Sequence, residues 1–411
     1  MNIKDNKNYD IVVVGGGISG ISASYIASLN GLKTLLIEKN SYLGGLITGG
    51  LVIPSMKIEA ENINQQFFND LIKYARNENA QITYGDGNPG WFNPIKIKDI
   101  FKKMLSNANC DILFESQPLK YKKNDKIIEY IEIKDKKIYS KYYIDATGNG
   151  SFSKLLGCEF LKDTNIKQLS SLRFIVSNVN LEELSEFLLE IDKDRNVTTS
   201  YRIEGSIHLS TACTSSGNWA LKPLFDKAVK DKILTKKDAD YFQIFTVAGE
   251  SDSVAFNCPR FKYSGQKSID KAKESIKRLH NFCKIYLKGF ENSYISQVAD
   301  IVGKRENGRV KSKYIYSIDD IKSGRTFDNI ALCSDYPIDI HSDKENESRL
   351  EKNGKYYLPV ESLMSYDYDN LYIIGKCLGA TFEAQAALRV QQSCASMGEA
   401  VAKDIVKKIN S

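Results

Sequence analysis

Residues 9–20 read YDIVVVGGGISG, in which four successive apolar residues lead directly into a G-x-G-x-x-G turn. The run Ile11–Val14 has the continuous apolar character of a parallel strand that is buried on both faces. Residues 19–29 are compatible with a helix that stops at Asn30-Gly31, and residues 33–38 predict a second strand. The order of strand, glycine turn, helix and strand predicts a βαβ unit that binds a dinucleotide.

Each glycine of the turn has its own physical role. Gly15 permits the tight turn, Gly17 lets the backbone approach a pyrophosphate, and Gly20 lets the helix pack closely against the strand. The start of the helix, at Ile18 and Ser19, presents free N–H groups and a partial positive charge to the phosphates.

An acidic residue closes the second predicted strand. Glu38 lies 18 residues beyond Gly20, close to the spacing of about 20 residues at which an acid accepts hydrogen bonds from the adenosine ribose hydroxyls. The alternative is a glycine turn in another kind of α/β protein, but the complete context of strand, helix, strand and acid favours a dinucleotide site. This unit alone does not separate FAD from NAD.

Composition places the chain among ordinary globular proteins. Of its 411 residues, 42% are hydrophobic and 26% charged, and the net charge is +6. The lysines are spread along the chain without a basic block interleaved with aromatic residues, so we expect a solvated surface and no nucleic-acid binding. No apolar run approaches the roughly 18 residues of a membrane helix. The eight cysteines form no C-x-x-C pair and no zinc spacing, so we expect no metal and a cytoplasmic protein with reduced thiols.

The segment after the second strand points to FAD by resemblance. Glu38-Lys39 followed by Gly44-Gly45 is similar to the extension of the flavoproteins with a two-dinucleotide fold, in which paired glycines let the backbone run along FAD. The sequence LITGGLV at residues 46–52 resembles their flavin-facing loop. Members that attach FAD covalently often use a His just after the glycines, where this chain has Ile47-Thr48, so non-covalent FAD is expected. The resemblance implies cofactor contacts at Lys39, Gly44, Gly45, Leu46 and Thr48.

The middle of the chain returns to the cofactor. Residues 111–119, 127–133 and 138–144 predict a small β-meander, and YYIDATGNG at residues 142–150 ends it in a glycine turn. In flavoproteins of this fold such a strand rejoins the parallel sheet beside the cofactor, which implies contacts at Ala146, Thr147 and Gly148. Gly148 is expected to avoid a side-chain clash, and the family usually has an acid where Asn149 stands.

The segment NLYIIGKCLGATFEAQAALRVQQSCASMGEAVA, residues 370–402, completes a family resemblance. The chain from Tyr9 to Ala402 resembles the FAD-dependent oxidoreductases related to the succinate dehydrogenase and fumarate reductase flavoproteins. A buried strand ends at Gly375, and a helix is predicted from about residue 387 to residue 407. The start of that helix would direct N–H groups to the pyrimidine edge of the flavin, which implies cofactor contacts at Arg389, Val390 and Gln391.

The resemblance implies an α/β fold with a Rossmann-type FAD-binding domain, made of a parallel sheet with a β-meander, and an inserted α+β substrate or cap domain. We expect the first part of the FAD-binding domain over residues 1–160, the cap over 161–300 and the second part over 301–411. In the cap, strands are predicted at 171–176, 203–209, 243–247 and 253–256, and helices at 181–191, 226–233 and 268–288.

Three residues are candidates for chemistry on a substrate. His341, in YPIDIH, matches the family pattern as a general base or a substrate anchor, although a structural His at the domain junction fits equally well. Arg260, in FNCPR, and Arg305, in GKREN, could bind a carboxylate through two hydrogen bonds each or form ion pairs between the domains. Relatives usually have a His where this chain has Phe382.

The leading hypothesis is a dehydrogenase or oxidase that transfers a hydride between a small carboxylate or amine and FAD. A reductase supplied by an electron-carrier protein, a tRNA-modifying flavoprotein and a non-catalytic flavin-binding subunit remain as alternatives. The substrate, the electron acceptor and the oligomeric state cannot be read from these residues.

Overall fold

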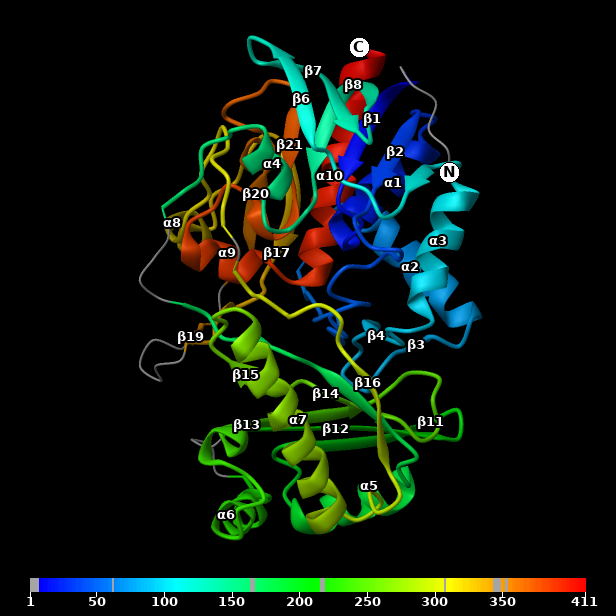
Figure 1. The fold of residues 1–411 in the computed structure, drawn as a ribbon, viewed down its shortest axis with the longest axis vertical. Helices are drawn as coiled ribbons and strands as arrows, with labels where there is room; N and C mark the ends of the chain where they lie inside the picture. Colours follow the sequence, from blue (N-terminus) through cyan, green and yellow to red (C-terminus); the bar gives the residue numbers. More distant parts are fainter. Residues whose placement is uncertain are drawn as a thin grey trace.

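The computed structural model describes residues 7–60, 63–162, 167–214, 219–306, 308–342, 349–351 and 354–411. It has two parts stacked along the long axis of the molecule (Figure 1), each built on its own large sheet. The first strand and the last helix lie in the upper part, which the chain leaves once for the lower part and then re-enters.

The upper part contains a seven-stranded sheet in the order β5-β2-β1-β8-β7-β6, with β21 paired to β8. The strands β5, β2, β1, β8 and β21 pair in parallel, whereas β6, β7 and β8 form an antiparallel meander. Their bounds are β1 Lys7–Val14, β2 Thr34–Ile37, β5 Asp111–Leu113, β6 Lys120–Asn124, β7 Ile127–Ile133, β8 Lys136–Asp145 and β21 Leu371–Ile373. The Rossmann-type sheet with a meander is confirmed.

The predicted strand over residues 111–119 is wrong in one respect, because the structure divides it. Residues 111–113 form β5 on the parallel side of the sheet, and the meander begins only at Lys120. Glu115 adopts a left-handed backbone with φ 50°, and Pro118 has no N–H to donate to a neighbouring strand, so the extended ladder cannot continue through this segment.

Two helices from opposite ends of the sequence pack against each other in the upper part. These are α1, Ile18–Leu29, and α10, Gln391–Asn410. The Ser22 hydroxyl donates to the Ala395 carbonyl at 2.7 Å, and a Cβ added to Gly398 would lie 2.2 Å from the Ser19 carbonyl oxygen. The remaining helices of this part are α2 Gln66–Asn77, α3 Ile97–Asn107, α4 Ser151–Leu155, α8 Ile318–Ser323 and α9 Phe382–Leu388, with short 3₁₀ turns η3 Val360–Leu363 and η4 Gly375–Cys377.

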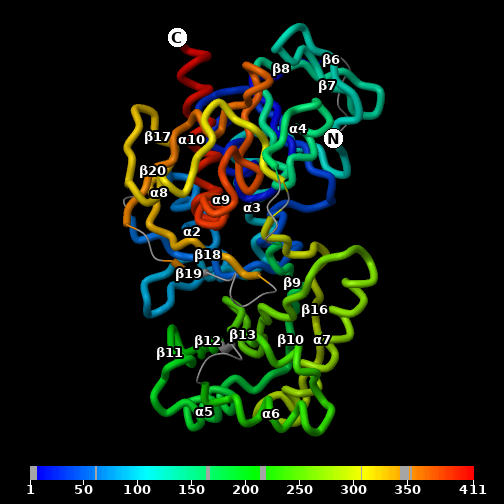
Figure 2. Tube along the Cα trace, turned by 90° about the vertical axis from the view of Figure 1, so that its left-hand side faces the viewer, coloured from blue at the N-terminus to red at the C-terminus, as the bar shows by residue number. Residues whose placement is uncertain are grey.

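The lower part is an antiparallel six-stranded sheet in the order β11-β12-β13-β14-β10-β16. Its strands are β10 Phe174–Ser177, β11 Thr198–Ile203, β12 Ser206–Thr214, β13 Tyr241–Thr246, β14 Val254–Phe256 and β16 Tyr294–Val298. The helices α5 Leu181–Ile191 and α6 Lys222–Lys230 lie on the side of the sheet away from the upper part, whereas α7 Gln266–Tyr286 begins near the upper part and runs past the sheet to that far side (Figures 1 and 2). The turn η1 spans Lys236–Ala239. Phe282 of α7 packs on Phe225 of α6 and Phe242 of β13, with ring centroids 4.3 and 6.2 Å away.

Each predicted element of the lower part has a counterpart, but the strand predicted over residues 203–209 crosses the turn between β11 and β12. The rest of β11 and all of β16 were not predicted. Two of the small two-stranded sheets join segments that are distant in the sequence, β9 Ser170–Ser171 with β15 Arg260–Phe261 and β17 Ile330–Ser334 with β20 Tyr356–Pro359. The others pair β3 Gln81–Ile82 with β4 Trp91–Phe92, and β18 Ile338–Ile340 with β19 Arg349–Glu351. The additional α+β unit is thus present, and its exact limits at residues 161 and 300 stay a prediction.

Candidate functional site

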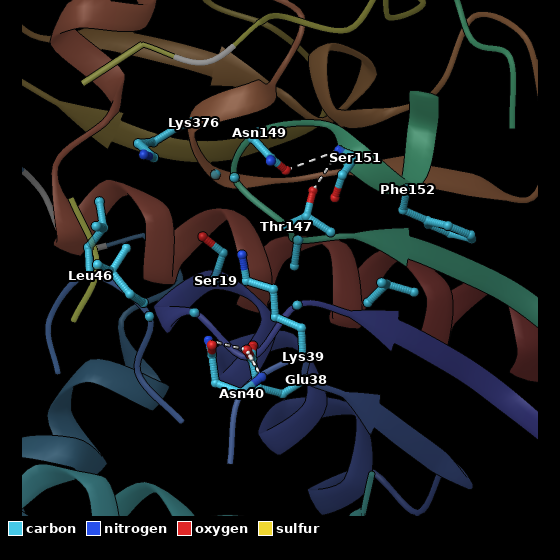
Figure 3. Close-up of a pocket in the computed structure, with 18 of the residues that line it drawn as sticks. Ser19, Glu38, Lys39, Asn40, Leu46, Thr147, Asn149, Ser151, Phe152 and Lys376 are labelled. Atoms are coloured by element: carbon cyan, nitrogen blue, oxygen red, sulfur yellow. Dashed lines mark hydrogen bonds between the residues drawn. The ribbon is translucent and has the colours of Figure 1, made fainter. Parts of the chain in front are cut away.

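A cavity of about 790 Å³ runs from the end of β1 to the start of α10. This volume lies in the range of cofactor sites. In Figure 3, Glu38, Lys39 and Asn40 lie at one end, Ser19 in the middle, and Leu46 and Lys376 toward the other end. Tyr263 and Ile269 complete the wall from the lower part of the molecule.

Most of the cofactor residues predicted from the sequence meet in this cavity. Its lining includes Gly15, Gly17, Ile18, Ser19, Glu38, Lys39, Gly44, Gly45, Leu46, Ala146, Thr147, Gly148, Gly375, Arg389 and Gln391. Gly20, Thr48 and Val390 lie beside the cavity without lining it. Thr48 donates its hydroxyl to the Leu43 carbonyl at 2.6 Å, and Val390 is the buried N-cap of α10.

The glycine turn leaves open space where a phosphate would approach. A Cβ added to Gly17 would have no atom within 4 Å, whereas one on Gly20 would lie 2.0 Å from the Gly15 carbonyl oxygen. Gly17 is the N-cap of α1, and no side chain caps that helix start. The N–H groups there are therefore available to an anion. This arrangement fits the pyrophosphate of a dinucleotide.

Glu38 is held in place at the end of β2. One carboxylate oxygen accepts from the Gly16 N–H at 2.6 Å, and the other accepts from the backbone and side-chain N–H groups of Asn40 at 2.8 and 2.6 Å. Glu38 is buried and lines the cavity. The fixed carboxylate keeps lone pairs for the ribose hydroxyls, because each of its oxygens can accept more than one hydrogen bond.

Asp145 fixes the turn that follows β8. Its oxygens accept from the N–H and hydroxyl of Thr147 at 3.0 and 2.7 Å and from those of Ser153 at 2.7 and 2.6 Å. Gly148 has φ 70°, and a Cβ there would lie an ordinary 3.5 Å from Lys376 Cε. Among the protein atoms no clash would arise there, and the left-handed backbone favours glycine; the avoidance of a clash with the cofactor stays a prediction.

Several lining residues were not predicted, among them Asn40, Tyr263, Lys304 and Lys376. Lys304 Nζ lies 3.4 Å from the centroid of the Tyr263 ring, which joins the two parts of the molecule at the cavity wall. A lysine directly after an apolar strand, as in LYIIGK, was a visible signal for Lys376. Tyr263 had no comparable signal, because only the tertiary arrangement brings it to the cavity.

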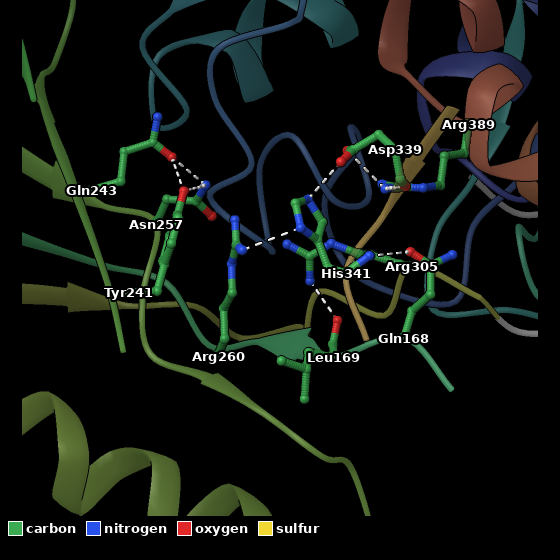
Figure 4. A network of polar contacts seen from close by, with 10 residues as sticks. All are labelled: Gln168, Leu169, Tyr241, Gln243, Asn257, Arg260, Arg305, Asp339, His341 and Arg389. Atoms are coloured by element: carbon green, nitrogen blue, oxygen red, sulfur yellow. Dashed lines mark hydrogen bonds and ion pairs between the residues drawn. The ribbon is translucent and has the colours of Figure 1, made fainter. Parts of the chain in front are cut away.

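A second group of polar residues lies beside the cavity, between the two parts (Figure 4). Arg389 lines the cavity and donates through Nη2 to Asp339 at 3.0 Å. The other oxygen of Asp339 lies 2.9 Å from His341 Nε2, and Arg260 Nη1 lies 3.2 Å from His341 Nδ1. Arg305 donates to the Leu169 carbonyl. The structure thus brings together the three catalytic candidates and joins them to the cofactor cavity.

Two further residues of this group were not predicted. Asp339 stands two positions before His341, on β18. Arg173 is buried at the start of β10 and donates to the carbonyls of Leu51 and Ile53 at 3.3 and 2.7 Å. We call Arg173, Arg260, Arg305 and Arg389 the arginine cluster.

The electrostatics of the arginine cluster show an excess of positive charge. Burial, together with the charges of Arg260 and Arg389, holds the pKa of Arg305 well below its usual value. Burial lowers the pKa of His341 to about 4 despite its hydrogen bond to Asp339, and the charges of Arg260 and Arg305 add to this effect. Burial alone would raise the pKa of Asp339, but the His341 hydrogen bond and the Arg389 charge outweigh it. At neutral pH His341 is neutral and Asp339 ionised.

The other notable side chains lie apart from the cluster. His208 is buried on β12 against the Tyr84 ring, 5.9 Å between centroids. His280 pairs with Ser293 at 3.0 Å. Phe382 is buried as the first residue of α9.

The family model for FAD dependent oxidoreductases matches residues 10–405. The chain belongs to this family, and FAD is its cofactor. The helix start, the fixed acid and the open space over Gly17 fit that cofactor. No helix among the described residues combines the length and apolar character that a membrane span requires.

The chain is also similar to individual proteins. It is 42% identical to the digeranylgeranylglycerophospholipid reductase of Methanococcus vannielii over 69 residues, 17% of this chain and 18% of that protein. It is 29% identical to the ferredoxin–NADP reductase of Malacoplasma penetrans over 157 residues, 36% of this chain and 39% of that protein. These matches thus span less than half of either relative. A geranylgeranyl bacteriochlorophyll reductase-like protein of Thermoplasma acidophilum has the same fold, with a TM-score of 0.50 at 15% identity over 98% of this chain and 79% of that one.

Proposed function

We propose that this protein transfers a hydride between non-covalent FAD and a small molecule that carries a carboxylate, as a dehydrogenase or oxidase. The observation that carries the proposal is the arginine cluster beside the cofactor cavity. Among the described residues, the contact of Arg389 with Asp339 is the one ion pair that the four arginines make. Cations that are removed from water without a matching anion are costly, and a carboxylate would compensate them.

Unused hydrogen-bond donors support the same conclusion. Four donors are buried with no hydrogen-bond partner in the described parts of the chain: Nε2 of Gln168 and the Nε atoms of Arg173, Arg260 and Arg389. Guanidinium groups bind carboxylates in pairs of parallel hydrogen bonds. An amine substrate would add positive charge to the site, so the carboxylate alternative is favoured.

The surroundings of His341 favour the substrate-anchor role over a general base. Nε2 faces the ionised Asp339 and Nδ1 faces Arg260. A neutral ring that donates from Nε2 must accept from Arg260 at Nδ1. His341 therefore orients Arg260 toward a substrate. Because the Nδ1 lone pair already accepts from Arg260, it is not available to take a proton from a substrate.

A reductase supplied by an electron carrier is the second candidate. The similarity to a reductase of ferredoxin and NADP, over about a third of the chain, supports it. The closer kinship with the succinate dehydrogenase and fumarate reductase flavoproteins stays a prediction.

An anaerobic titration with matched ligands tests the proposal. Saturated and unsaturated carboxylic acids, each paired with its primary amide, are added to the oxidised and to the dithionite-reduced holoprotein. We expect an acid, and not its amide, to change the visible flavin absorbance. Bleaching of oxidised flavin would support the dehydrogenase direction, and reoxidation of reduced flavin the reductase direction. Equal responses to acid and amide would contradict a carboxylate site.

A further inference from the structure

Lys376 is a cation in the cofactor cavity that has no carboxylate partner among the described residues. It follows Gly375 in η4, is partly buried and lines the cavity. Its Nζ donates to the Lys304 carbonyl at 2.7 Å. Within the part of the chain that the structure describes, no acidic side chain forms an ion pair with Lys376, and the positive charges of Arg389 and Lys304 act on it.

Lys376 lies between two elements that line the cavity. A Cβ on Gly375 would lie 2.7 Å from the Ser19 hydroxyl, at the start of α1, and a Cβ on Gly148 would lie 3.5 Å from Lys376 Cε. The Gln385 side chain donates to the Lys376 carbonyl at 3.0 Å. The lysine is therefore held where the start of α1 and the turn after β8 meet.

This position leaves a positive charge that the protein itself does not neutralise. Burial lowers the pKa of Lys376 to about 8, and the charges of Arg389 and Lys304 act in the same direction. FAD carries a negatively charged pyrophosphate, and a bound anion would favour the charged lysine. Bound FAD would thus supply the negative charge that Lys376 lacks as a partner.

We propose that Lys376 is an FAD-binding residue, whose ammonium group contacts the anionic groups of the cofactor. This inference depends on the FAD site alone and holds whatever the substrate is.

Affinity measurements on the full chain, stripped of FAD and reconstituted, test the role of Lys376. We expect Lys376→Met to weaken FAD binding roughly tenfold to a hundredfold, since a charge-assisted hydrogen bond is lost. Lys376→Arg retains the charge and should restore most of the affinity. Lys277, whose side chain is 69% exposed and pairs with Glu274 away from the cavity, is the control, and Lys277→Met should change the affinity less than about twofold.

The stability of the FAD-free protein separates binding from structure. Removing a desolvated charge should leave the thermal midpoint of FAD-free Lys376→Met unchanged or raise it, whereas a structural lysine would lower it. Unchanged FAD affinity in Lys376→Met, or a fall in affinity that only accompanies a lower thermal midpoint and that Lys376→Arg does not restore, would overturn the proposal.

Proton uptake gives a further readout. The titratable and charged groups with the largest effects on Lys376 are Lys304, Cys377, Arg389 and Cys394. At pH 8.5, calorimetry in two buffers of different ionisation enthalpy should show that FAD binding takes up a proton in the wild type and takes up less in Lys376→Met. Equal uptake in both would count against the contact. Parallel titrations with ADP show which part of FAD the lysine contacts. If Lys376→Met weakens the binding of ADP and FAD equally, the contact is with the phosphates. If it weakens the binding of FAD alone, the contact is with the flavin half.

Discussion

His341 and Arg389 contact opposite oxygens of the same carboxylate, that of Asp339, at 2.9 and 3.0 Å. Arg389 lines the cofactor cavity, and His341 contacts Arg260 of the lower part. A continuous polar path of Arg260, His341, Asp339 and Arg389 therefore connects the proposed substrate site with the cofactor.

Loss of the shared carboxylate should destabilise this path. Asp339→Asn leaves Arg389 without its counter-charge, and we expect the free energy of unfolding to fall by about 2 kcal/mol. Asp369, which pairs with Lys313 and whose side chain is 56% exposed, is the control, and Asp369→Asn should change it by less than about 0.5 kcal/mol. Urea denaturation measures both. Equal effects of the two variants would show that Asp339 does not hold the path together.

The pH dependence of stability should show the neutral state of His341. Its pKa is lowered to about 4 in the folded protein, against about 6.5 in the unfolded chain. The unfolded state thus binds the proton first, so this contribution is complete above pH 6.5 and is lost as the pH falls toward 4. At pH 5 the free energy of unfolding is lower by about 2 kcal/mol because of this histidine.

Replacement of the histidine isolates that contribution. We expect His341→Gln to lose less stability than the wild type between pH 7 and pH 5, in urea denaturation at both values. His280→Gln removes a histidine outside the path and serves as a comparison. An unaltered slope in His341→Gln would mean that His341 titrates normally.

Arg260, in the lower part of the molecule, should determine the affinity for the substrate. Arg260 stacks on the Tyr241 ring, 3.3 Å from its centroid, which orients the guanidinium. We expect Arg260→Met to raise the KM for a carboxylate substrate roughly tenfold or more, with partial recovery in Arg260→Lys, because a directed charged contact is lost. Arg202, exposed on β11, is the control. Steady-state kinetics check this, and KM values unchanged in Arg260→Met would exclude a substrate contact.

Two glycines of the same turn should respond differently to alanine. At Gly17 the added Cβ points into open space, whereas at Gly20 it would meet the Gly15 carbonyl at 2.0 Å. Gly17→Ala should therefore fold with a loss of about 1 kcal/mol or less and bind FAD weakly, while Gly20→Ala should lose stability itself. Thermal unfolding and FAD titration distinguish the two. Full FAD affinity in Gly17→Ala would contradict a close approach of the pyrophosphate.

The sequence predicted those parts of the site whose residues lie close together along the chain. The turn from Gly15 to Gly20 and the acid Glu38 are adjacent in a single βαβ unit, so spacing alone predicts their meeting. By contrast, Tyr263 reaches the cavity only through the packing of the lower part on the upper one. The role of Asp339 in YPIDIH could not be predicted from the sequence, because its partner Arg389 is 50 residues away.

The contact between α1 and α10 has a consequence for biosynthesis. The cavity needs both the first βαβ unit and residues 375–394, which a ribosome completes almost a whole chain length later. The first βαβ unit therefore lacks one wall of the cavity until residues 375–394 have been synthesised. The full FAD site can accordingly form only after residues 375–394 have packed onto the first βαβ unit.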